Sequence, residues 1–375
     1  MKFAPPRPKL SASTSPVIII GAGPAGLAVA ACLARRGVPL LLLERDRHVG
    51  SSWRRHYQQL QLHTDKARSA LPDLPFPHGT PRYPTRNQFI AYLEAYTQHF
   101  RLEPRFGIDV HDVVKDGDRW RVVTNQGGFL TGHVVLATGH AARARLPTWP
   151  GMSEFAGVVL HTSRYQTGLP FRHTRVLVIG AGNSAQDVAL DLIAHQAHVS
   201  WSVRSATNVI PRDPLGLPVL LVAQALRHLP ARWRDTLTHP LRWWLYHDLP
   251  RYGLPAPPYG PFVQIERDGR VPVIDTGIAR ALREHAVRLL GEIHHFTPNG
   301  VVLNSGVEHH FDVVILATGY APARFPSQPP MPGNGLYVCG QQVAATGMLH
   351  AISREARRIA ADIARQQARA SRPRR

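Results

Sequence analysis

The segment 17–26 reads Val-Ile-Ile-Ile-Gly-Ala-Gly-Pro-Ala-Gly. Its four apolar residues predict a buried strand, and the glycine turn leads into a helix predicted over roughly 24–36. In this fingerprint the glycines allow a tight turn, close approach of a pyrophosphate and helix–strand packing. The free N–H groups of the helix N-terminus favour the negative charge of a phosphate. The residues expected at this site are Gly21, Gly23, Pro24, Ala25 and Gly26.

Residues 176–185 repeat the pattern as Val-Leu-Val-Ile-Gly-Ala-Gly-Asn-Ser-Ala. One such fingerprint is weak evidence, but two in one chain predict two nucleotides bound side by side. A flavin with a nicotinamide is the usual pairing, and it implies redox chemistry. The predicted fold class is therefore α/β, with two Rossmann-like dinucleotide-binding domains. The expected residues of the second site are Gly180, Gly182, Asn183 and Ser184.

The end of the second strand in each unit distinguishes the two nucleotides. Glu44 closes a strand expected over 39–44, where a carboxylate accepts hydrogen bonds from a ribose diol, so the first site favours FAD, with Arg45 beside it. The corresponding strand of the second unit ends in Arg204 and Ser205, and an arginine there pairs with a 2′-phosphate, which favours NADPH over NADH. The competing interpretations are a surface ion pair for Glu44 and an ordinary exposed arginine for Arg204.

Each fingerprint is followed, much later in the chain, by an apolar strand that runs into Ala-Thr-Gly, at 134–139 and 313–319. This repetition predicts two nucleotide-binding halves, with the NADPH domain inserted into the FAD domain. The alternating residues of 105–126 predict a small antiparallel sheet, from which Val110 is expected to reach the adenine. Further expected site residues are Thr138 and Gly139 for FAD, and Thr318, Gly319 and Tyr320 for NADPH.

The expected division of the chain follows from these repeats and from composition. It comprises a disordered leader (1–15), the first part of the FAD domain (16–150), the NADPH domain (151–308) with an aromatic and apolar insertion (206–260), the C-terminal part of the FAD domain (309–364) and a basic tail (365–375). The insertion is predicted to form helices interrupted at Pro230, Pro240 and Pro250. Packing around the mouth of the active site is the favoured role for 215–250; weak peripheral contact with a membrane is the alternative.

Charge and cysteine content exclude some classes of protein. The net charge of +19 comes almost entirely from arginines spread along the chain, which argues against a nucleic-acid partner and suits anionic cofactors. The two cysteines, Cys32 and Cys339, exclude a disulfide framework and the paired-cysteine motif of flavin disulfide reductases. They favour a reduced, cytoplasmic setting. No secretory signal is expected, because residues 1–15 lack an apolar core.

Several motifs resemble those of the class B flavin-dependent monooxygenases. The stretch 50–54 (Gly-Ser-Ser-Trp-Arg) is similar to a segment that lies near the flavin in that family. Residues Phe155, Gly157, His161 and Tyr165 match its identifying motif, and 60–64 (Leu-Gln-Leu-His-Thr) and 251–254 (Arg-Tyr-Gly-Leu) look like the YUCCA-type branch. That branch oxidatively decarboxylates indole-3-pyruvate.

The resemblance implies an enzyme that uses NADPH, FAD and O2 to oxygenate a small organic molecule through a C4a-(hydro)peroxyflavin. An aryl keto acid or a soft nitrogen or sulfur nucleophile is the implied substrate. One alternative is a flavin-dependent NADPH oxidase or reductase that oxygenates nothing. Another is a non-catalytic nucleotide sensor.

The resemblance also implies roles for individual residues. His63 stands where amine- and sulfide-oxidising members have an asparagine that supports the oxygenated flavin; a purely structural histidine is the competing interpretation. The motif 155–165 is expected to lie in the linker between the domains and to couple nicotinamide binding to the relative orientation of the domains, rather than to transfer protons. The FAD residues added by the resemblance are Ser52, Trp53, His63 and Gln341, and the candidate catalytic residues are His63, Lys66 and Asn183.

Overall fold

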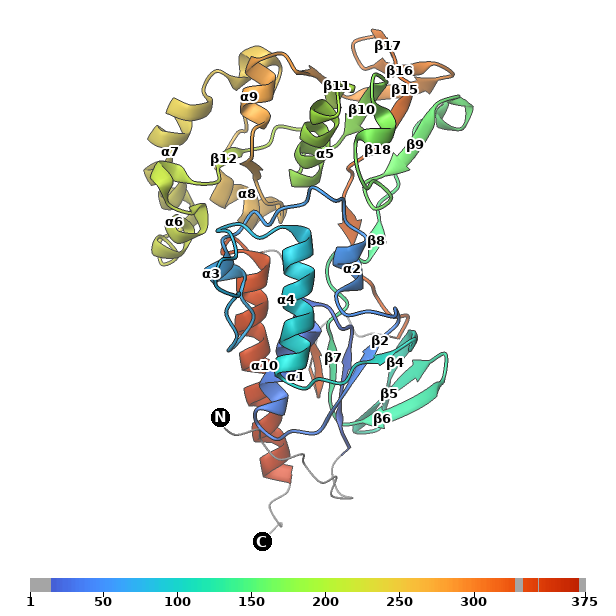
Figure 1. Cartoon of the computed structure of the whole chain (residues 1–375), viewed down its shortest axis with the longest axis vertical. Coiled ribbons are helices and arrows are strands. Elements are labelled where there is room, and N and C mark those ends of the chain that lie inside the picture. The colour runs from blue at the N-terminus through green and yellow to red at the C-terminus, as the bar shows by residue number, and fades with distance from the viewer. Residues whose placement is uncertain (1–14, 328–332, 343, 371–375) are drawn as a thin grey trace.

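The computed structural model describes residues 15–327, 333–342 and 344–370. The described chain forms two domains, each built on a five-stranded parallel sheet, with a helical insertion beside them (Figure 1). The predicted α/β class with two Rossmann-like domains is therefore confirmed. Nearly all of the expected leader, residues 1–14, lies outside the described residues.

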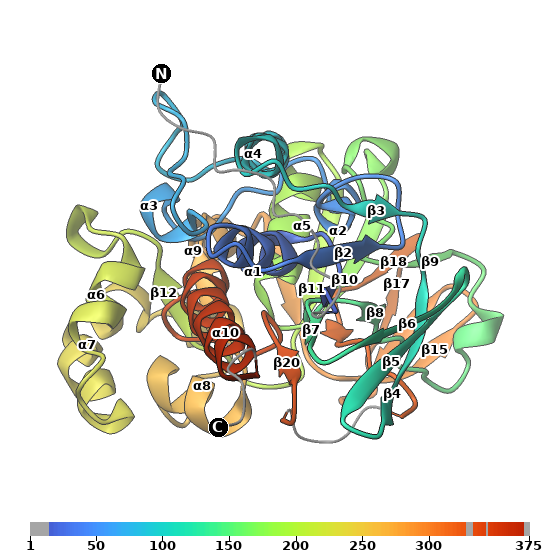
Figure 2. The same ribbon diagram turned by 90° about the horizontal axis from the view of Figure 1, so that it is seen from below.

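The first domain is built on a sheet of strand order β20-β7-β1-β2-β3. Alternate side chains of β1 serve two cores: Val17 and Ile19 pack beneath helices, whereas Ile18 and Ile20 pack against an antiparallel sheet. Helices α1 and α10 lie side by side over the first face (Figure 2). The strands are β1 (Val17–Ile20), β2 (Leu40–Glu44), β3 (Arg105–Phe106), β7 (Val134–Leu136) and β20 (Leu336–Val338), and the helices are α1 (Pro24–Ala34), α4 (Arg86–His99) and α10 (Met348–Ala370).

The antiparallel sheet expected over 105–126 is present as β4 (Val110–Asp116), β5 (Arg119–Thr124) and β6 (Gly127–Thr131). Residues 105–106 differ from this expectation, because they form β3, which pairs with β2 in the parallel sheet. The C-terminal helix also differs. Since α10 continues to Ala370, residues 365–370 are helical and not a tail; the remaining residues, 371–375, lie outside the described residues.

The second domain repeats this plan with the strand order β14-β11-β10-β18-β9. Val176 and Val178 of β10 face α5 and α9, whereas Leu177 and Ile179 face the antiparallel sheet β15-β16-β17. The elements are β9 (Val158–His161), β10 (Arg175–Ile179), α5 (Asn183–Ala194), β11 (His198–Ser202), α9 (Ile278–Arg283), β14 (Val287–Leu290), β15 (Ile293–Thr297), β16 (Gly300–Leu303), β17 (Glu308–His310) and β18 (Val313–Leu316).

The strand pairing corrects the expected domain boundary at 309. Strand β18 pairs in parallel with both β10 and β9, so it belongs to the second domain. The chain returns to the first domain only after β18. Its two crossings between the domains pair with each other, β8 (Arg143–Ala144) running antiparallel to β19 (Tyr320–Ala321).

The insertion, defined here as residues 206–275, is longer than the expected 206–260. It begins with β12 (Val209–Pro211) and ends with β13 (Val273–Asp275), which pair in parallel. Between them lie α6 (Val219–Ala225), α7 (Ala231–Tyr246) and α8 (Pro261–Asp268), at one side of the molecule (Figure 1). The expected interruption at Pro240 is wrong, because α7 runs through it. A proline removes a single N–H hydrogen bond, and packing of α7 on α8 outweighs that loss.

The remaining elements are short: α2 (Ser51–Arg54), α3 (Lys66–Ser69) and 3₁₀ turns at Met152–Glu154, Leu169–Phe171, Pro214–Gly216 and Leu249–Tyr252. None of the helices in the described part of the chain is long and apolar enough to cross a membrane.

Candidate functional site

A cavity of about 1210 Å³ lies where the two domains and the insertion meet. The N-termini of α1 and α5 both open into it, and α6, α7 and α8 supply an apolar wall. The structure thus brings together most of the predicted site. The predicted residues that line the cavity are Gly21, Gly23, Pro24, Ala25, Glu44, Arg45, Ser52, Trp53, His63, Val110, Thr138, Gly139, Asn183, Ser184 and Tyr320.

The glycines of the first fingerprint have different roles. A Cβ on Gly21 would lie 2.6 Å from the Ala137 carbonyl oxygen, and one on Gly26 would lie 1.8 Å from the Gly21 oxygen. These two glycines therefore allow strand and helix to pack. By contrast, a Cβ on Gly23 would meet no protein atom within 4 Å. The space in front of Gly23, at the start of α1, fits the diphosphate of a dinucleotide.

Glu44 is buried at the end of β2 and lines the same cavity. Its Oε2 accepts a hydrogen bond from the Ala22 N–H at 2.7 Å, and its Oε1 accepts one from the Asp46 N–H at 3.1 Å. The competing interpretation of a surface ion pair is therefore wrong. Its carboxylate is positioned where an adenosine ribose would extend from the glycine turn, and ribose binding stays a prediction.

The second fingerprint has the same geometry. A Cβ on Gly180 would lie 2.3 Å from the Ala317 oxygen, whereas Gly182 faces open space at the start of α5. The next residue differs from expectation. The Asn183 Nδ2 donates to the Pro272 carbonyl at 3.1 Å, and its Oδ1 accepts from the Ile274 N–H at 2.8 Å. Both ends of this amide hold β13 against α5, so the structure gives Asn183 a structural contact in place of the expected catalytic one.

The proposed 2′-phosphate residues lie at the outer end of β11, beyond the cavity lining. The Arg204 side chain is 78% exposed, with its Nε 3.8 Å from Glu292. Ser205 Oγ accepts a hydrogen bond from the Arg270 Nη1 at 3.1 Å. Arg270 was missed from the sequence because it lies in the insertion, far from the fingerprint. At this end of the strand, Arg204 therefore lies beside Glu292, and Arg270 lies beside Ser205 and Asp268.

His63 is joined to the second domain through Asp187 of α5. Its Nε2 lies 3.0 Å from Asp187 Oδ2, which also accepts from the Tyr57 hydroxyl at 2.7 Å. An ionised carboxylate only accepts, so Nε2 carries a proton; in a neutral ring, Nδ1 is then an acceptor. Nδ1 is buried with no partner among the described residues. Burial and the nearby Asp187 raise the Tyr57 pKa well above its usual value.

Tyr57 and Asp187 line the cavity, and both were missed from the sequence. One signal was present: Asp187 follows Asn183 by one helical turn, so it faces the same side of α5. The prediction for Lys66 is wrong. Its ammonium donates to the Thr80 carbonyl at 2.5 Å, and the residue is absent from the cavity lining.

Three further histidines line the cavity, His56, His111 and His140. Burial, assisted by His140 and nearby arginines, lowers the pKa of His56 to about 4. Burial also lowers the pKa of His140. Both rings are therefore neutral near pH 7, which keeps further positive charge out of an arginine-rich cavity.

Gln341 joins the ends of two strands of the first sheet. Its Nε2 donates to the Thr138 hydroxyl at 3.1 Å, so the segment after β20 is tied to the segment after β7. Gln341 itself does not line the cavity, whereas the neighbouring Gly340 does. Its predicted contact with FAD stays a prediction.

The expected linker position of the motif 155–165 is wrong, because its strand β9 pairs with β18 in the sheet of the second domain. Phe155 is in the core beneath β15, and a Cβ on Gly157 would lie 2.5 Å from the Asp312 oxygen. His161 Nε2 is 3.1 Å from the Gly319 oxygen, and its ring contacts that of Tyr320 edge-on. The Tyr165 hydroxyl donates to Asp191 of α5 at 2.6 Å. The motif thus touches both α5 and the second domain crossing, as the coupling hypothesis requires; coupling itself stays a prediction.

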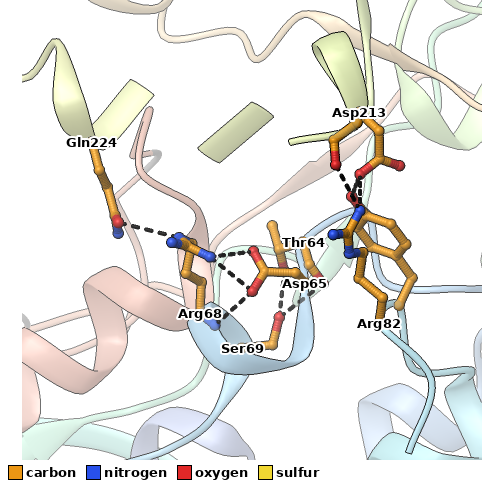
Figure 3. A network of polar contacts seen from close by, with 9 residues as sticks. Thr64, Asp65, Arg68, Ser69, Arg82, Asp213 and Gln224 are labelled. Atoms are coloured by element: carbon orange, nitrogen blue, oxygen red, sulfur yellow. Dashed lines mark hydrogen bonds and ion pairs between the residues drawn. The ribbon is translucent and has the colours of Figure 1, made fainter. Parts of the chain in front are cut away.

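Polar contacts join the insertion to the first domain (Figure 3). Arg82 and the Tyr83 hydroxyl both donate to Asp213 of the insertion. Arg68 is held by Asp65 and donates to Gln224 of α6 at 3.1 Å. The apolar residues of α6 line the cavity behind these contacts. The packing role predicted for 215–250 is therefore confirmed for α6, whereas Trp233, Trp243 and Trp244 of α7 are exposed.

Comparisons with known proteins agree with this geometry. A family model described as pyridine nucleotide-disulphide oxidoreductase matches residues 18–214. The chain is 42% identical to indole-3-pyruvate monooxygenase YUCCA1 of Oryza sativa subsp. japonica, over 81% of this chain and 76% of that protein. It is 38% identical to the probable indole-3-pyruvate monooxygenase YUCCA1 of Arabidopsis thaliana, over 81% and 75%.

Solved structures share the fold. The flavin-containing monooxygenase from Stenotrophomonas maltophilia matches with a TM-score of 0.73 and 23% identity, over 94% of this chain and 98% of that one. A steroid monooxygenase bound to NADP matches with a TM-score of 0.76 and 19% identity, over 94% and 86%. The two cysteines of the sequence, Cys32 and Cys339, are both free and buried.

The two glycine cradles fit FAD and NADPH, and the likeness to the relatives extends over four fifths of the chain. The chain therefore belongs to the YUCCA-type branch of the class B flavin-dependent monooxygenases, and it is an FAD- and NADPH-dependent enzyme that oxygenates a small organic molecule.

Proposed function

We propose that the substrate is an aryl keto acid of the indole-3-pyruvate type and that the reaction is oxidative decarboxylation. The observation that carries this proposal is the 42% identity to a plant enzyme named for that substrate. The cavity supports it, because its outer wall is made by apolar side chains of α6, α7 and α8 that suit an aromatic ring.

The proposed reaction consumes one keto acid, one O2, one NADPH and one proton. It releases the carboxylic acid shortened by one carbon, CO2, NADP⁺ and water. The bond between the keto and carboxyl carbons breaks, one oxygen atom of O2 enters the new carboxylate, and the other leaves in water. The two electrons for this reduction come from NADPH.

The residues of the chain bind, orient and shield the reactants. When bound, FAD supplies the hydride acceptor and the reaction with O2. Gly23 and the α1 N-terminus would hold its diphosphate, and Gly182 with Ser184 would hold that of NADPH. His63 would line the cavity with its ring held by Asp187. The apolar wall of the insertion would exclude water.

Isotope labelling tests the proposal directly. The purified holoenzyme is given indole-3-pyruvate, NADPH and ¹⁸O2, and the acid product is examined by mass spectrometry. We expect indole-3-acetate that carries one ¹⁸O atom. A panel containing an amine and a thioether is run in parallel. Oxygenation of those compounds with no labelled acid would overturn the proposal in favour of a soft nitrogen or sulfur substrate, and hydrogen peroxide alone would favour an oxidase.

We also propose a cytoplasmic enzyme whose α7 makes weak contact with anionic membrane surfaces. Trp233, Trp243 and Trp244 are exposed along α7 beside the exposed Arg232. Indole rings suit the interface of a bilayer, and arginine suits anionic lipid. Sedimentation with vesicles should show binding to phosphatidylserine-rich but not to phosphatidylcholine vesicles, with loss in Trp233→Ser/Trp244→Ser. Equal recovery of the wild type and of the double variant in the supernatant with phosphatidylserine-rich vesicles would contradict the proposed membrane contact.

A further inference from the structure

Arg242 places an incompletely satisfied positive charge in the wall of the cavity. It lies on α7, is partly buried and lines the cavity with the apolar residues of the insertion. Its Nη1 donates to Asn208 Oδ1 at 2.5 Å. Its Nε is buried and has no hydrogen-bond partner among the described residues. One side of the guanidinium is therefore held by the protein while the Nε–H is left without an acceptor.

No carboxylate of the described chain neutralises Arg242 within 4.0 Å. Asp235 of the same helix attracts it, but both Asp235 oxygens accept hydrogen bonds from the Phe262 and Val263 N–H groups at the start of α8. The preceding arginine of this helix face, Arg234, is instead paired with Glu266. Burial lowers the pKa of Arg242, in keeping with a guanidinium that lacks its counterion.

The contact that holds Arg242 is itself fixed. Asn208 is buried, and its Nδ2 donates to the Tyr259 carbonyl and to Gln264 Oε1, both at 2.9 Å. Its own N–H donates to the same Gln264 oxygen at 3.1 Å. With Asn208 fixed in this way, its Oδ1 has one orientation and sets the plane of the guanidinium. Arg242 is thereby fixed in the cavity wall with no carboxylate of the described chain to balance its charge, while its Nε itself is covered by protein.

Buried arginines are rare unless they are paired, because an unpaired charge in a low-dielectric site is costly. Here the chain holds the Arg242 guanidinium in place but provides no carboxylate to pair with it. The neighbouring cavity residues, Leu237 and Leu241 of α7 and Phe262 and Ile265 of α8, are apolar. A ligand that fits this surface combines a carboxylate with an apolar ring.

We propose that Arg242 binds the carboxylate of the substrate and that the leucine and phenylalanine side chains beside it contact the aryl ring. This assignment rests on the proposed function and adds the residue that selects for an acid. It makes Arg242 the group that distinguishes a keto acid from an uncharged ketone, an amine or a sulfide. The competing anion is the diphosphate of NADPH, which enters the same cavity.

The test compares two ligands that differ in the carboxylate. Indole-3-lactate carries it and indole-3-ethanol lacks it, and neither has the keto group that the proposed reaction attacks. Their dissociation constants are measured with the holoenzyme from the change in flavin absorbance. The variant Arg242→Gln retains a side-chain amide for Asn208 and removes the charge. Arg232→Gln removes an exposed charge from the same helix and serves as the matched control.

In Arg242→Gln the dissociation constant for indole-3-lactate should rise about 10- to 100-fold, the range for a charge-assisted hydrogen bond. In the same variant, the affinity for indole-3-ethanol and the KM for NADPH should stay within about twofold of wild type. In Arg232→Gln, the affinities for both indole ligands and the KM for NADPH should all stay within about twofold of wild type. Arg242→Lys, which keeps the charge but not the fork, should fall between the two. Retention of FAD shows that each variant is folded.

Three results would overturn this assignment. The first is an equal loss of affinity for both indole ligands in Arg242→Gln, and the second is an unchanged affinity for indole-3-lactate. The third is a raised KM for NADPH alone, which would mean that Arg242 binds the nucleotide diphosphate. None of these depends on the isotope experiment. If wild type forms labelled indole-3-acetate while Arg242→Gln binds indole-3-lactate normally, the proposed function stands and the assignment of Arg242 fails. If wild type forms no labelled acid, the proposed function fails.

Discussion

Asp187 shows how one residue can set the state of its neighbours across a domain boundary. It lies on α5 of the second domain, yet its carboxylate accepts hydrogen bonds from Tyr57 and His63 of the first. His63 therefore donates through Nε2, and in a neutral ring this places its one proton on that nitrogen. Asp187 is thus a positioning residue that fixes the tautomer of a cavity histidine and contributes to holding the two domains together.

Asp187→Asn should weaken the coupling between NADPH oxidation and product formation. An amide can donate to His63 and so no longer fixes the Nε2–H tautomer. We expect hydrogen peroxide released per NADPH to rise and product kcat to fall by about tenfold, the effect of one charged hydrogen bond. Peroxide and product are assayed together. Tyr57→Phe, which leaves the histidine contact intact, should change the ratio less. If Asp187→Asn leaves the hydrogen peroxide released per NADPH unchanged, the role of His63 is only structural.

Arg204→Ala should raise the KM for NADPH about tenfold or more while changing the KM for NADH little, because only NADPH carries the 2′-phosphate. Arg270→Ala should act in the same direction through its place beside Ser205. Arg280→Ala, which removes an exposed arginine from α9, is the control. Steady-state kinetics with both nucleotides measures the effect. Equal changes for NADPH and NADH would refute the phosphate assignment.

At this scale the sequence predicts contiguous motifs and misses contacts between distant segments. The glycine turns were found because each is complete within ten residues. Tyr57, Asp187 and Arg270 were missed because their partners lie in other segments. Lys66 was chosen for its nearness to His63 in sequence, but α3 directs its ammonium toward Thr80.

Among the secondary-structure elements, the two strand–turn–helix units have the same glycine geometry but different sequences. In both units one glycine permits close packing of the turn on the neighbouring strand, and a second leaves open space at the helix N-terminus. The strands were predictable because each is a short apolar run with turn residues after it. The continuation of α7 through Pro240 was not predictable. A proline ends a helix only where packing does not compensate for the lost N–H hydrogen bond.

The open glycines predict separable losses of the two cofactors. Gly23→Ala should reduce FAD content while the chain stays folded, because the added methyl fills only the space meant for a diphosphate. Gly182→Ala should keep FAD and raise the KM for NADPH. Flavin content, circular dichroism and steady-state kinetics measure the outcomes. Gly26→Ala is the contrasting variant and should destabilise the first domain, since its methyl would overlap the Gly21 carbonyl. Loss of FAD in Gly182→Ala would contradict the division of roles.

At the scale of the whole molecule, two copies of one topology face a shared cavity. The chain crosses between them twice, and the crossings pair as β8 and β19. The sequence reveals the repeat but places the boundary too early, because an apolar strand does not say which sheet it joins. Only the pairing of β18 with β10 and β9 assigns it to the second domain.

Several histidines whose pKa is lowered in the folded chain make the stability of this fold decrease in acid. The pKa of His56 is about 4 in the folded chain against 6.5 for an unperturbed histidine, so the unfolded chain takes up the proton first as pH falls. Stability from this group is present above pH 6.5 and is lost as pH falls toward 4. His133, His140, His161, His309 and His350 shift in the same direction.

Thermal unfolding should therefore show a Tm that falls from pH 7 to pH 5, with a smaller fall in His56→Gln than in wild type. His78→Gln, which alters an exposed ring, should follow wild type. If His56→Gln loses as much stability over this range as wild type, burial of a neutral imidazole at this position is not a source of the pH dependence.

We expect one chain to hold FAD and NADPH against each other in the cavity between its domains. Anaerobic rapid mixing of the yellow holoenzyme with NADPH deuterated on one or the other face of the nicotinamide tests it most directly. The flavin absorbance should bleach in a saturable, single phase, with a primary isotope effect for one face only. A flavin that stays oxidised, or bleaching with no isotope effect for either face, would contradict the claim.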